Sequence, residues 1–325
     1  MNKILITGGA GYIGSHVLKM LGEQGHDITV IDDLSTGREA SILYGKFLKF
    51  DLGDKEKLEE VIKNGNFDIC YHFAGSIIVP ESVSDPIKYY ENNTVKTFNL
   101  LKLCKTYKIN KFIFSSTAAV YGDTEGGLCS ETTPIKPLNP YGKTKYMTEW
   151  MLEDFANAYP DFKYVIFRYF NVAGANIDGK IGQCSPNATH LIKIASEAAV
   201  GKRPGMEIYG EDYDTEDGTC IRDYIHIDDL AQAHVDAMSY LETENKSQVF
   251  NCGYGKGFSV KEVIATVKKV SGKDFNVKVS GRRPGDSAKL MSKVEKIKNV
   301  LKWKPKYNDI ELIVKTALDW EAKLK

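Results

Sequence analysis

The sequence has no excess of charge of either sign. Lysine and arginine together number 43, aspartate and glutamate also number 43, and the formal net charge is zero. A balanced chain carries no overall field that attracts nucleic acid, so we expect no nucleic-acid partner. We expect no membrane partner either, because no apolar run has the roughly 20 residues that a spanning helix needs.

Cysteine is scarce and follows no pattern. The six cysteines are scattered and none forms a Cys-x-x-Cys pair, which argues against a zinc knuckle or a disulfide framework, so we predict no metal. The opening residues, MNKILITGGA, lack the charged region, long apolar core and cleavage site of a signal peptide. Together these features favour a cytoplasmic protein with reduced thiols.

The first half of the chain alternates regularly between two kinds of pattern. Helical patterns occur near residues 14–24, 55–63, 86–107 and 140–159. Between them, six short apolar runs predict buried strands: KILIT, DITVID, FLKFDL, FDICYHFAG, KFIFSST and KYVIFRYF. Apolar strands joined by helices predict an α/β fold of the Rossmann type, a doubly wound parallel sheet covered on both faces.

The pattern loosens after Asn171, where loops rich in Gly, Asp and Pro separate shorter helices near 228–241, 259–270 and 309–323. We expect a first lobe over residues 1–170 and a smaller α/β substrate-binding lobe over 171–325. The two are expected to be interleaved, because strands near 222–226 and 248–251, within 222–251, would return to the first lobe.

Three glycines follow the first predicted strand in ILITGGAGYIGSHV. Gly8 would allow a tight turn, Gly11 would let a pyrophosphate approach the backbone, and Gly14 would let the helix pack on the sheet. The N-terminus of that helix offers free N–H groups to phosphates. Glycines alone are weak evidence, but the flanking strand and helix favour a dinucleotide site.

An acidic residue ends the second predicted strand, in VIDDLSTG. Asp32 would accept hydrogen bonds from the adenosine ribose and repel a 2′-phosphate, so NAD is favoured over NADP, although Arg38 lies close enough in sequence to accommodate that phosphate. Asp51 is a plausible partner for the adenine amino group. Small residues in Phe73–Gly75 would admit the cofactor.

Tyr141 and Lys145 are four residues apart in NPYGKTK and share a helical face. An ammonium near a phenol stabilises the phenolate and lowers the tyrosine pKa, which gives a base that works near neutrality. Such a base would take a proton from a sugar hydroxyl while the adjacent carbon loses hydride. Upstream, three hydroxyls at Ser115–Thr117 end a strand, and one of them would hydrogen-bond the same oxygen.

These motifs resemble the extended short-chain dehydrogenase/reductases. Longer segments follow one another in the order seen in the UDP-glucose 4-epimerase family and span most of the chain: TGGAGYIGSH, HFAG, the Asn92–Asn93 pair, NPYGKTK, RYFNVAGA, TEDGTCIRDYIH and RRPGD. The resemblance implies interconversion of UDP-galactose and UDP-glucose. Tyr141 takes the proton of the sugar 4-hydroxyl, tightly held NAD takes hydride from C4, and both return to the opposite face.

The resemblance also implies roles for residues matched one by one. Thr117 would orient the 4-oxygen, and Lys145 would hold the nicotinamide ribose. The implied NAD-binding positions are Gly8, Gly11, Tyr12, Ile13, Gly14, Asp32, Asp33, Asp51, Leu52, Phe73, Ala74, Gly75, Asn93, Ser115, Tyr141, Lys145 and Tyr169. The implied UDP-sugar positions are Thr117, Tyr141, Phe170, Asn171, His190, Leu191, Tyr209, Arg222, Arg283, Asp286 and Leu290, with the two arginines on the diphosphate.

Three positions bear on the substrate. Ile77 stands where many family members have a lysine, and Pro80 stands where a glycine is frequent. Leu290 stands at the position that faces the sugar 2-substituent. A tyrosine there restricts family members to hexoses, while smaller residues admit N-acetyl groups. Leu290 is intermediate in size, so we hypothesise activity on UDP-glucose and UDP-galactose, with UDP-GlcNAc and UDP-GalNAc as further substrates.

Other functions stay open. A nucleotide-sugar 4,6-dehydratase needs an acid pair directly after the strand-end threonine, where this chain has Ala118 and Ala119. A UDP-uronic acid decarboxylase has no positive support in the sequence. A non-catalytic NAD-binding regulator would share the fold, but such proteins often lose the tyrosine or the lysine.

Two helices carry more apolar surface than one core requires. One side of the helix near 140–159 presents Met147, Trp150 and Met151, and the helix near 86–107 carries a stripe: Val95, Phe98, Leu101 and Cys104. The plain interpretation is intramolecular core. The resembling family pairs these helices with their symmetry mates in a four-helix bundle, so we predict a homodimer.

Overall fold

A computed structural model describes residues 1–186, 188–283 and 286–324. The chain divides into two compact units that share it in alternating segments. The first unit comprises Met1–Val120, Pro137–Arg168 and Ala231–Phe250, and the second comprises Tyr121–Lys136, Tyr169–Leu230 and Asn251–Lys325. Within the described part of the chain, no helix is long and apolar enough to cross a membrane.

A seven-stranded sheet organises the first unit, and it confirms the predicted Rossmann-type α/β fold. Its strand order is β3-β2-β1-β4-β5-β7-β11, and β1 is parallel to both β2 and β4. The strands are β1 (Lys3–Thr7), β2 (Asp27–Asp32), β3 (Lys46–Lys49), β4 (Ile69–His72), β5 (Lys111–Thr117), β7 (Lys163–Tyr169) and β11 (Gln248–Cys252). The order reverses between β1 and β4, which is where nucleotides bind in sheets of this class.

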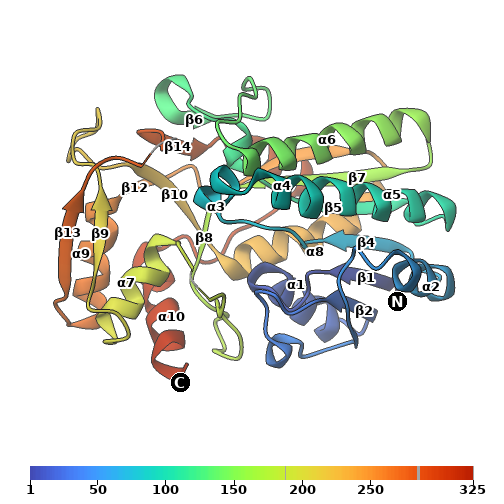
Figure 1. Ribbon diagram of the computed structural model, residues 1–325, viewed down its shortest axis with the longest axis horizontal. Coiled ribbons are helices and arrows are strands. Elements are labelled where there is room, and N and C mark those ends of the chain that lie inside the picture. The colour runs from blue at the N-terminus through green and yellow to red at the C-terminus, as the bar shows by residue number, and fades with distance from the viewer. Residues whose placement is uncertain (187, 284–285, 325) are drawn as a thin grey trace. The chain divides into compact units, whose positions relative to one another are not determined.

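Helices cover both faces of this sheet (Figure 1). One side carries α2, α5 and α6, whose apolar residues form a core with Phe112, Phe114 and Cys70. The other side carries α1 and α8. The helices of the first unit are α1 (Tyr12–Glu23), α2 (Lys55–Gly65), α3 (Val79–Ser84), α4 (Pro86–Tyr89), α5 (Lys96–Thr106), α6 (Pro140–Ala158) and most of α8 (Ile227–Thr243), with 3-10 turns η1 (Glu39–Ser41) and η3 (Ala118–Val120). Pro140 at the first position of α6 suits a helix start, and Asn139 caps it.

The helix predicted near 86–107 is not one regular helix. A π-helical segment, η2 (Tyr90–Val95), separates α4 from α5. Its wider turn changes which side chains share a face. Leu101 and Cys104 are buried in the core of the first unit, whereas Val95 and Phe98 are exposed. The four residues therefore do not form the single outward stripe that the sequence pattern predicts.

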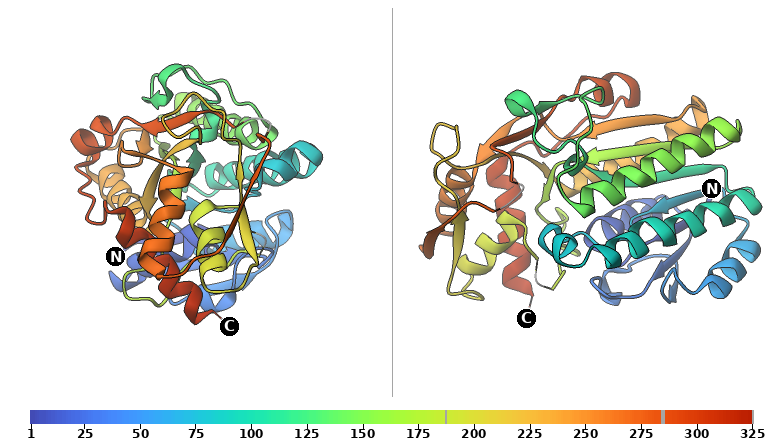
Figure 2. Two further views of the ribbon diagram at one scale, coloured as in Figure 1. Left: turned by 90° about the vertical axis from the view of Figure 1, so that its left-hand side faces the viewer. Right: turned by 45° about the horizontal axis from the view of Figure 1, so that its top comes forward.

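The second unit has two smaller sheets. One has the order β12-β10-β14-β6, with β8 beside β10, and the other pairs β13 with β9. Helices α7, α9 and α10 lie side by side (Figure 2). The elements are β6 (Leu128–Cys129), β8 (Asn171–Ala173), α7 (Leu191–Ala199), β9 (Gly205–Tyr209), β10 (Ile221–His226), β12 (Gly257–Ser259), α9 (Val260–Ser271), β13 (Asn276–Ser280), β14 (Lys289–Ser292) and α10 (Ile310–Lys323), with the short helical segments η4 (Glu125–Gly127) and η5 (Ile297–Leu301).

The two strands expected to return to the first lobe behave differently. Gln248–Cys252 joins the seven-stranded sheet beside β7, as expected. The expectation for Arg222–His226 is wrong. This strand pairs with β8, β12 and β14 inside the second unit, and β12 and β14 occupy its two edges.

Candidate active site

The turn after β1 is shaped by close backbone packing. Gly8 has a φ of 75°, and a Cβ placed on it would lie 2.4 Å from the main-chain nitrogen of Ala74. A Cβ on Gly14 would lie 2.3 Å from the Gly8 oxygen. Both contacts are shorter than atoms tolerate, so these two positions require glycine for the fold itself. The turn also brings the end of β1 against Phe73–Ala74 after β4.

Gly11 is different from its two neighbours. A Cβ there would meet only the Gly8 oxygen, at 3.2 Å, and Gly11 stands directly before Tyr12 and Ile13 at the start of α1, with no side-chain cap on the helix. The fold therefore requires glycine less strictly at position 11 than at positions 8 and 14. An open backbone at an uncapped helix N-terminus suits a pyrophosphate, so the turn fits a dinucleotide.

Asp32 is a buried carboxylate at the end of β2. Its two oxygens accept hydrogen bonds from the backbone of Ala10 at 2.9 Å and of Leu34 at 2.8 Å. Burial raises the pKa of Asp32, and these backbone bonds oppose that rise. A carboxylate oxygen accepts more than one bond, so Asp32 has capacity left for ribose hydroxyls. Beside it, Asp33 accepts from the Ser35 backbone at 2.8 Å.

Asp51 lies in an ion pair at the surface. Its carboxylate accepts from Lys96 Nζ at 2.6 Å and from the Gly53 backbone at 2.6 Å. The pKa of Asp51 is lowered: burial raises it, and the bonds to Lys96 and Gly53 outweigh burial. The next residue, Leu52, is buried. These contacts keep Asp51 ionised and fix its position. A contact between Asp51 and the adenine of the cofactor remains a prediction.

The loop after β4 converges with η2 and α6. Asn93 accepts a bond from the Ser76 backbone at 2.7 Å and donates to Thr144 Oγ1 at 3.1 Å. A Cβ on Gly75 would meet Asn93 Oδ1 at 3.0 Å and Lys145 Nζ at 3.6 Å. Three residues predicted to bind the cofactor, Gly75, Asn93 and Lys145, therefore lie together.

Tyr141 and Thr117 form the centre of the predicted chemistry. The Thr117 side chain lies beside the Tyr141 phenol, although the two residues come from β5 and α6. The Tyr141 ring also lies edge-on to Tyr89, with centroids 6.5 Å apart. Burial raises the pKa of Tyr141, and the neighbouring Thr117 side chain opposes that rise.

The expectation that Lys145 lowers the pKa of Tyr141 is wrong for this structure. Lys145 Nζ donates to the main-chain oxygen of Ser115 at 2.9 Å and lies 5.0 Å from the centroid of Phe114. Its charge is directed at the sheet, and burial dominates at the phenol. Lys145 is itself affected, because burial lowers its pKa to about 8 while the Glu149 carboxylate opposes that fall.

Sequence reasoning missed a buried ion pair beside this centre. Arg168 on β7 binds both carboxylate oxygens of Glu149 on α6, with Nη2–Oε2 at 2.5 Å and Nε–Oε1 at 3.1 Å. The spacing in the sequence could have pointed to Glu149, because it stands four residues after Lys145 and eight after Tyr141, on the same helical face.

In the second unit, several predicted substrate residues lie on strands β9, β10 and β14 and on the loop before β14. Arg222 on β10 stands opposite Leu290 on β14. Its guanidinium donates to the Ile221 oxygen at 2.9 Å and lies 3.6 Å from the Asp286 carboxylate. The Arg283 guanidinium stacks 3.6 Å from the centroid of the Tyr209 ring. Residues 284–285 of the RRPGD motif lie outside the described residues.

The remaining predicted substrate residues lie around β8 and α7. Phe170 is buried and donates its backbone N–H to the Cys252 oxygen at 3.4 Å. Asn171, two residues after Tyr169, begins β8 and pairs with Tyr224. Asn171 is thus held by strand pairing with β10, while Phe170 is held by its bond to the end of β11.

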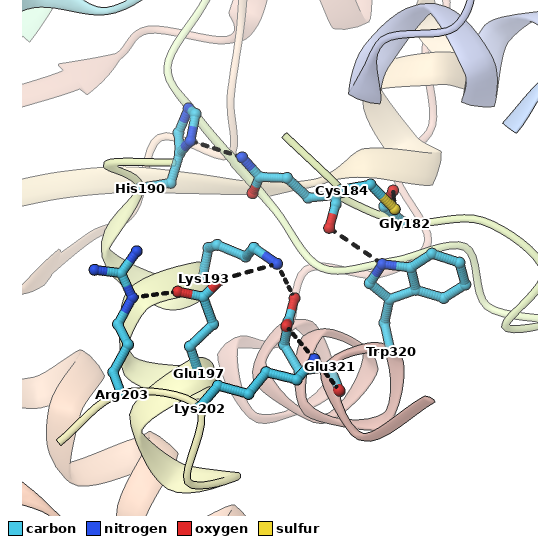
Figure 3. Close-up of polar contacts among 10 residues, drawn as sticks. Gly182, Cys184, His190, Lys193, Glu197, Lys202, Arg203, Trp320 and Glu321 are labelled. Atoms are coloured by element: carbon cyan, nitrogen blue, oxygen red, sulfur yellow. Dashed lines mark hydrogen bonds and ion pairs between the residues drawn. The ribbon is translucent and has the colours of Figure 1, made fainter. Parts of the chain in front are cut away.

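His190 and Leu191 begin α7 at a small cavity of about 10 Å³, the space of about one water molecule. His190 Nδ1 lies 2.8 Å from Gln183 Nε2, and burial lowers the His190 pKa. Figure 3 shows Lys193 bridging Glu197 and Glu321. His190 is thus a neutral, hydrogen-bonded side chain, and sequence reasoning missed its partner Gln183.

The described residues contain no group of three or more His, Cys, Asp or Glu side chains placed to hold a metal ion. The cysteines are present as free thiols.

Comparison with known proteins agrees with this geometry. Residues 4–253 match the family described as "NAD dependent epimerase/dehydratase family". The UDP-glucose 4-epimerase of Azospirillum brasilense is 49% identical over 99% of this chain and 93% of its own length. The structure of the UDP-Glc/GlcNAc 4-epimerase from Campylobacter jejuni is 52% identical, covers 100% of both chains and has a TM-score of 0.87. The UDP-glucose 4-epimerase from Brucella ovis, in complex with NAD, is 41% identical over 98% of both chains, with a TM-score of 0.94. The chain belongs to the NAD-dependent epimerase/dehydratase family.

Proposed function

We propose that this protein is an isomerase that interconverts UDP-galactose and UDP-glucose at C4, with NAD bound throughout. The observation that carries the proposal is that Tyr141 and Thr117 lie side by side, in the unit that also holds Lys145 and the glycine turn. Identity to UDP-glucose 4-epimerases over nearly the full length supports it. By the same reasoning, the first unit binds NAD and the second binds the nucleotide sugar.

The NAD-binding residues are those around the glycine turn and the ends of β2 and β4. Gly11 and the start of α1 would hold the pyrophosphate, and Asp32 would hold the adenosine ribose. Asn93 and Lys145 would hold the nicotinamide end, since both lie against Gly75. When bound, NAD supplies the hydride acceptor for C4 and returns the hydride to the sugar.

The chain's own residues handle the proton. The Tyr141 oxygen would receive the proton of the sugar 4-hydroxyl and later give it back. Thr117, whose side chain lies beside that phenol, would hold the 4-oxygen within reach. Burial of Tyr141 excludes water, which makes the unpaired phenolate costly. The positive charge of Lys145, in the same buried region, favours the charged form of the phenol when substrate is in place.

The second unit would hold the UDP portion. Arg222 and Arg283 offer guanidinium groups to the diphosphate. Tyr209, which stacks on Arg283, and Asp286 are proposed to face the ribose and uracil, together with Phe170, Asn171, His190 and Leu191. Of these, His190 would act as a neutral hydrogen-bonding group, because burial lowers its pKa.

We also propose activity on N-acetylated sugars. Leu290 lies opposite Arg222 in the β10–β14 pair, and a leucine leaves more room than a tyrosine at this position. The similar Campylobacter jejuni protein is described as a UDP-Glc/GlcNAc 4-epimerase. A 4,6-dehydratase is disfavoured, because the residues after Thr117 are Ala118 and Ala119, and an apolar side chain transfers no proton.

A homodimer and a cytoplasmic location complete the proposal. Exposed apolar side chains gather on α3, α4, η2, α5 and α6 of the first unit: Val83, Ile87, Val95, Phe98 and Trp150. These helices pack against one another, and exposed apolar side chains on neighbouring helices favour an interface, here with a second copy of the chain. Free thiols suit a reducing compartment.

The test of the function is an assay without added nicotinamide. Purified protein is mixed with UDP-galactose, and the sugar is followed by proton NMR. We expect approach to a mixture of UDP-glucose and UDP-galactose. If nothing changes, NAD is added. If the NMR signals of the sugar still do not change with NAD present, UDP-galactose is not a substrate. The same assay with UDP-GlcNAc would then test the N-acetylated sugars.

A further inference from the structure

A buried glutamine contacts the histidine among the proposed substrate residues. Gln183 Nε2 lies 2.8 Å from His190 Nδ1, and Gln183 is 5% exposed. A buried side-chain amide is costly unless it is hydrogen-bonded, and the bond to His190 meets part of that need. The function proposed above gives Gln183 no role.

The main chain at Gln183 is held from two sides. Its carbonyl oxygen accepts a hydrogen bond from Trp320 Nε1 on α10 at 3.2 Å. The preceding residue, Gly182, pairs with Ala175 in an isolated bridge, and a Cβ on Gly182 would lie 2.6 Å from the Trp320 ring. These contacts use main-chain atoms, so the side-chain amide of Gln183 is left for His190.

His190 is held at the start of α7. Its carbonyl oxygen accepts from the Ile194 backbone at 3.0 Å, and α7 packs against α10. Lys193 bridges Glu197 on α7 and Glu321 on α10, which ties the two helices together (Figure 3). The histidine therefore meets its amide partner from a fixed backbone.

The bond between the two side chains determines where the imidazole carries its proton. A neutral imidazole has one nitrogen that donates and one that accepts, whereas an amide nitrogen only donates. Because Gln183 Nε2 donates, His190 Nδ1 accepts, and the proton of the neutral ring is on Nε2. Burial lowers the pKa of His190, which favours the neutral ring.

His190 Nε2 is the ring atom left for a ligand. It makes no hydrogen bond to any residue that the structure describes, and it is not one of the described side-chain atoms that are buried without a partner, so it is accessible. A nucleoside diphosphate offers oxygens that only accept, on its phosphates and on its uracil. An N–H at Nε2 binds such an oxygen, whereas the lone pair of the other tautomer would repel it.

We propose that Gln183 is a positioning residue for the substrate: its amide holds His190 in the tautomer that donates from Nε2 to an acceptor oxygen of the UDP portion. The proposal deepens the proposed function and rests on it for the binding of UDP by the second unit. The acceptor is a phosphate oxygen or a uracil carbonyl oxygen, which share this chemistry.

The tautomer is measured directly by long-range proton–nitrogen NMR on the purified protein with isotope-labelled histidine. The signals of His190 are those that disappear in His190→Gln. We expect a protonated Nε2 and an unprotonated Nδ1 at neutral pH. A proton on Nδ1, alone or together with one on Nε2, would overturn the proposal, and this measurement needs no substitution at Gln183.

Two substitutions at Gln183 change the bond in different ways. Gln183→Glu replaces the donor with an acceptor of the same shape, so we expect the proton to move to Nδ1. Gln183→Met removes the donor and adds neither acceptor nor charge, so we expect a mixture of tautomers. At a pH where NMR shows a neutral ring, the dissociation constant of UDP should rise at least about tenfold in Gln183→Glu and less in Gln183→Met. Calorimetric titration with UDP measures both.

A double-mutant cycle separates this effect from that of the added charge. A glutamine at position 190 has an N–H whatever its neighbour is, so Gln183→Glu should cost little UDP affinity in the His190→Gln background. Equal losses in both backgrounds would overturn the proposal, because they would come from the charge or from the fold. If Gln183→Glu does not fold, Gln183→Met takes its place, and an unchanged dissociation constant despite mixed tautomers would overturn the proposal.

Titration with uridine distinguishes the two acceptors. A loss of affinity in Gln183→Glu for UDP but not for uridine assigns the bond to a phosphate oxygen, and equal losses assign it to the uracil. A loss for neither ligand contradicts the role of Gln183.

Turnover gives a further check. We expect Gln183→Glu to raise KM for UDP-galactose more than it lowers kcat, and a lower kcat with an unchanged KM would contradict a role in binding. If the unsubstituted protein binds UDP but does not turn over UDP-galactose, the proposed function fails. The tautomer and the UDP dissociation constants would then still decide whether Gln183 positions His190.

Discussion

Leu290 stands directly opposite Arg222 in the parallel pair of β14 and β10. Residues opposite each other in a parallel pair point to the same face of the sheet, so the proposed diphosphate ligand and the proposed neighbour of the sugar 2-substituent are adjacent. Leu290→Tyr should therefore crowd an N-acetyl group more than a hydroxyl. We expect kcat/KM for UDP-GlcNAc to fall at least about tenfold relative to that for UDP-galactose. An unchanged ratio of the two activities would remove Leu290 from substrate selection.

Replacement of the proposed base has a different expected result. Tyr141→Phe removes the phenol oxygen and keeps the ring against Tyr89. We expect kcat to fall by roughly 10²–10⁴-fold, the range for loss of a general acid or base. The NAD content of the purified protein, measured after acid release, should stay at the parent level. A Tyr141→Phe variant with near-parent turnover would show that another group moves the proton.

Two glycines of the same turn should respond differently to alanine. A Cβ on Gly14 would lie 2.3 Å from the Gly8 oxygen, whereas a Cβ on Gly11 would meet only the same atom at 3.2 Å. Alanine ordinarily favours a helix over glycine by about 1 kcal/mol, but an overlap with fixed backbone costs more. We expect Gly14→Ala to lower the free energy of unfolding by about 3 kcal/mol.

Gly11→Ala should act on the cofactor instead. We expect a smaller loss of stability than for Gly14→Ala, and an NAD dissociation constant at least about tenfold higher, because the new methyl group occupies the space proposed for the pyrophosphate. Denaturant titration and calorimetric NAD binding on the two variants check both statements. Equal stability losses, with NAD binding intact in Gly11→Ala, would contradict the assignment of this turn.

His72 predicts how the first unit responds to acid. Its ring bridges Thr7 Oγ1 at 2.6 Å and Thr97 Oγ1 at 2.7 Å, and burial lowers its pKa from 6.5 to about 3. Between these values the unfolded chain holds a proton that the folded chain lacks. The stabilising effect of a neutral His72 is therefore complete above pH 6.5 and is lost as the pH falls towards 3, by roughly 1.4 kcal/mol per pH unit.

The measurement is the free energy of unfolding between pH 7 and pH 4, compared with a His72→Asn variant. Asparagine does not titrate, so the variant should start less stable and lose less stability on acidification. Parallel curves for the two proteins would show that His72 does not control the acid response.

The apolar residues on α4 and α5 give a test of the proposed dimer. Ile87 is 79% exposed and Phe98 is 44% exposed. A charge placed at either position should weaken an apolar interface while costing a monomer little. We expect Ile87→Asp and Phe98→Glu to shift the mass from dimer to monomer in light scattering at micromolar concentration. Leu43→Asp, at an exposed apolar residue between β2 and β3, serves as the control and should stay dimeric. A parent protein of monomer mass would refute the dimer.

The sequence predicted what depends on local pattern. The turn at Gly8 and the start of α6 at Pro140 follow from residues that are neighbours in the chain, and the strand periods predicted the central sheet. The pairing of β10 was predicted wrongly, because the residues of a short strand do not indicate which sheet the strand joins. The π-helical segment at Tyr90–Val95 was missed for a related reason: its residues have an ordinary helical pattern.

The residues that form the site remain a prediction, and the structure adds directions that the sequence does not contain. Thr117 lies beside Tyr141, and Lys145 follows one helical turn after Tyr141 on α6. The direction of the Lys145 ammonium was not predictable, because its acceptor is the main-chain oxygen of Ser115, and every residue has such an oxygen. Glu149 was predictable from its spacing along α6, but its partner Arg168 was not, since nothing local relates α6 to β7.

The interleaving of the two units has a consequence for the order in which the protein is made. A ribosome releases the chain from its N-terminus, and units tend to fold as they emerge. The strands at the centre of the first unit's sheet precede Val120, so that sheet begins to form early. Leu128–Cys129, by contrast, pairs with Lys289–Ser292, so β6 has no partner strand until most of the chain has been synthesised. The second unit therefore cannot complete this sheet before Lys289–Ser292 has emerged, and the nucleotide-sugar binding proposed for this unit depends on that late step.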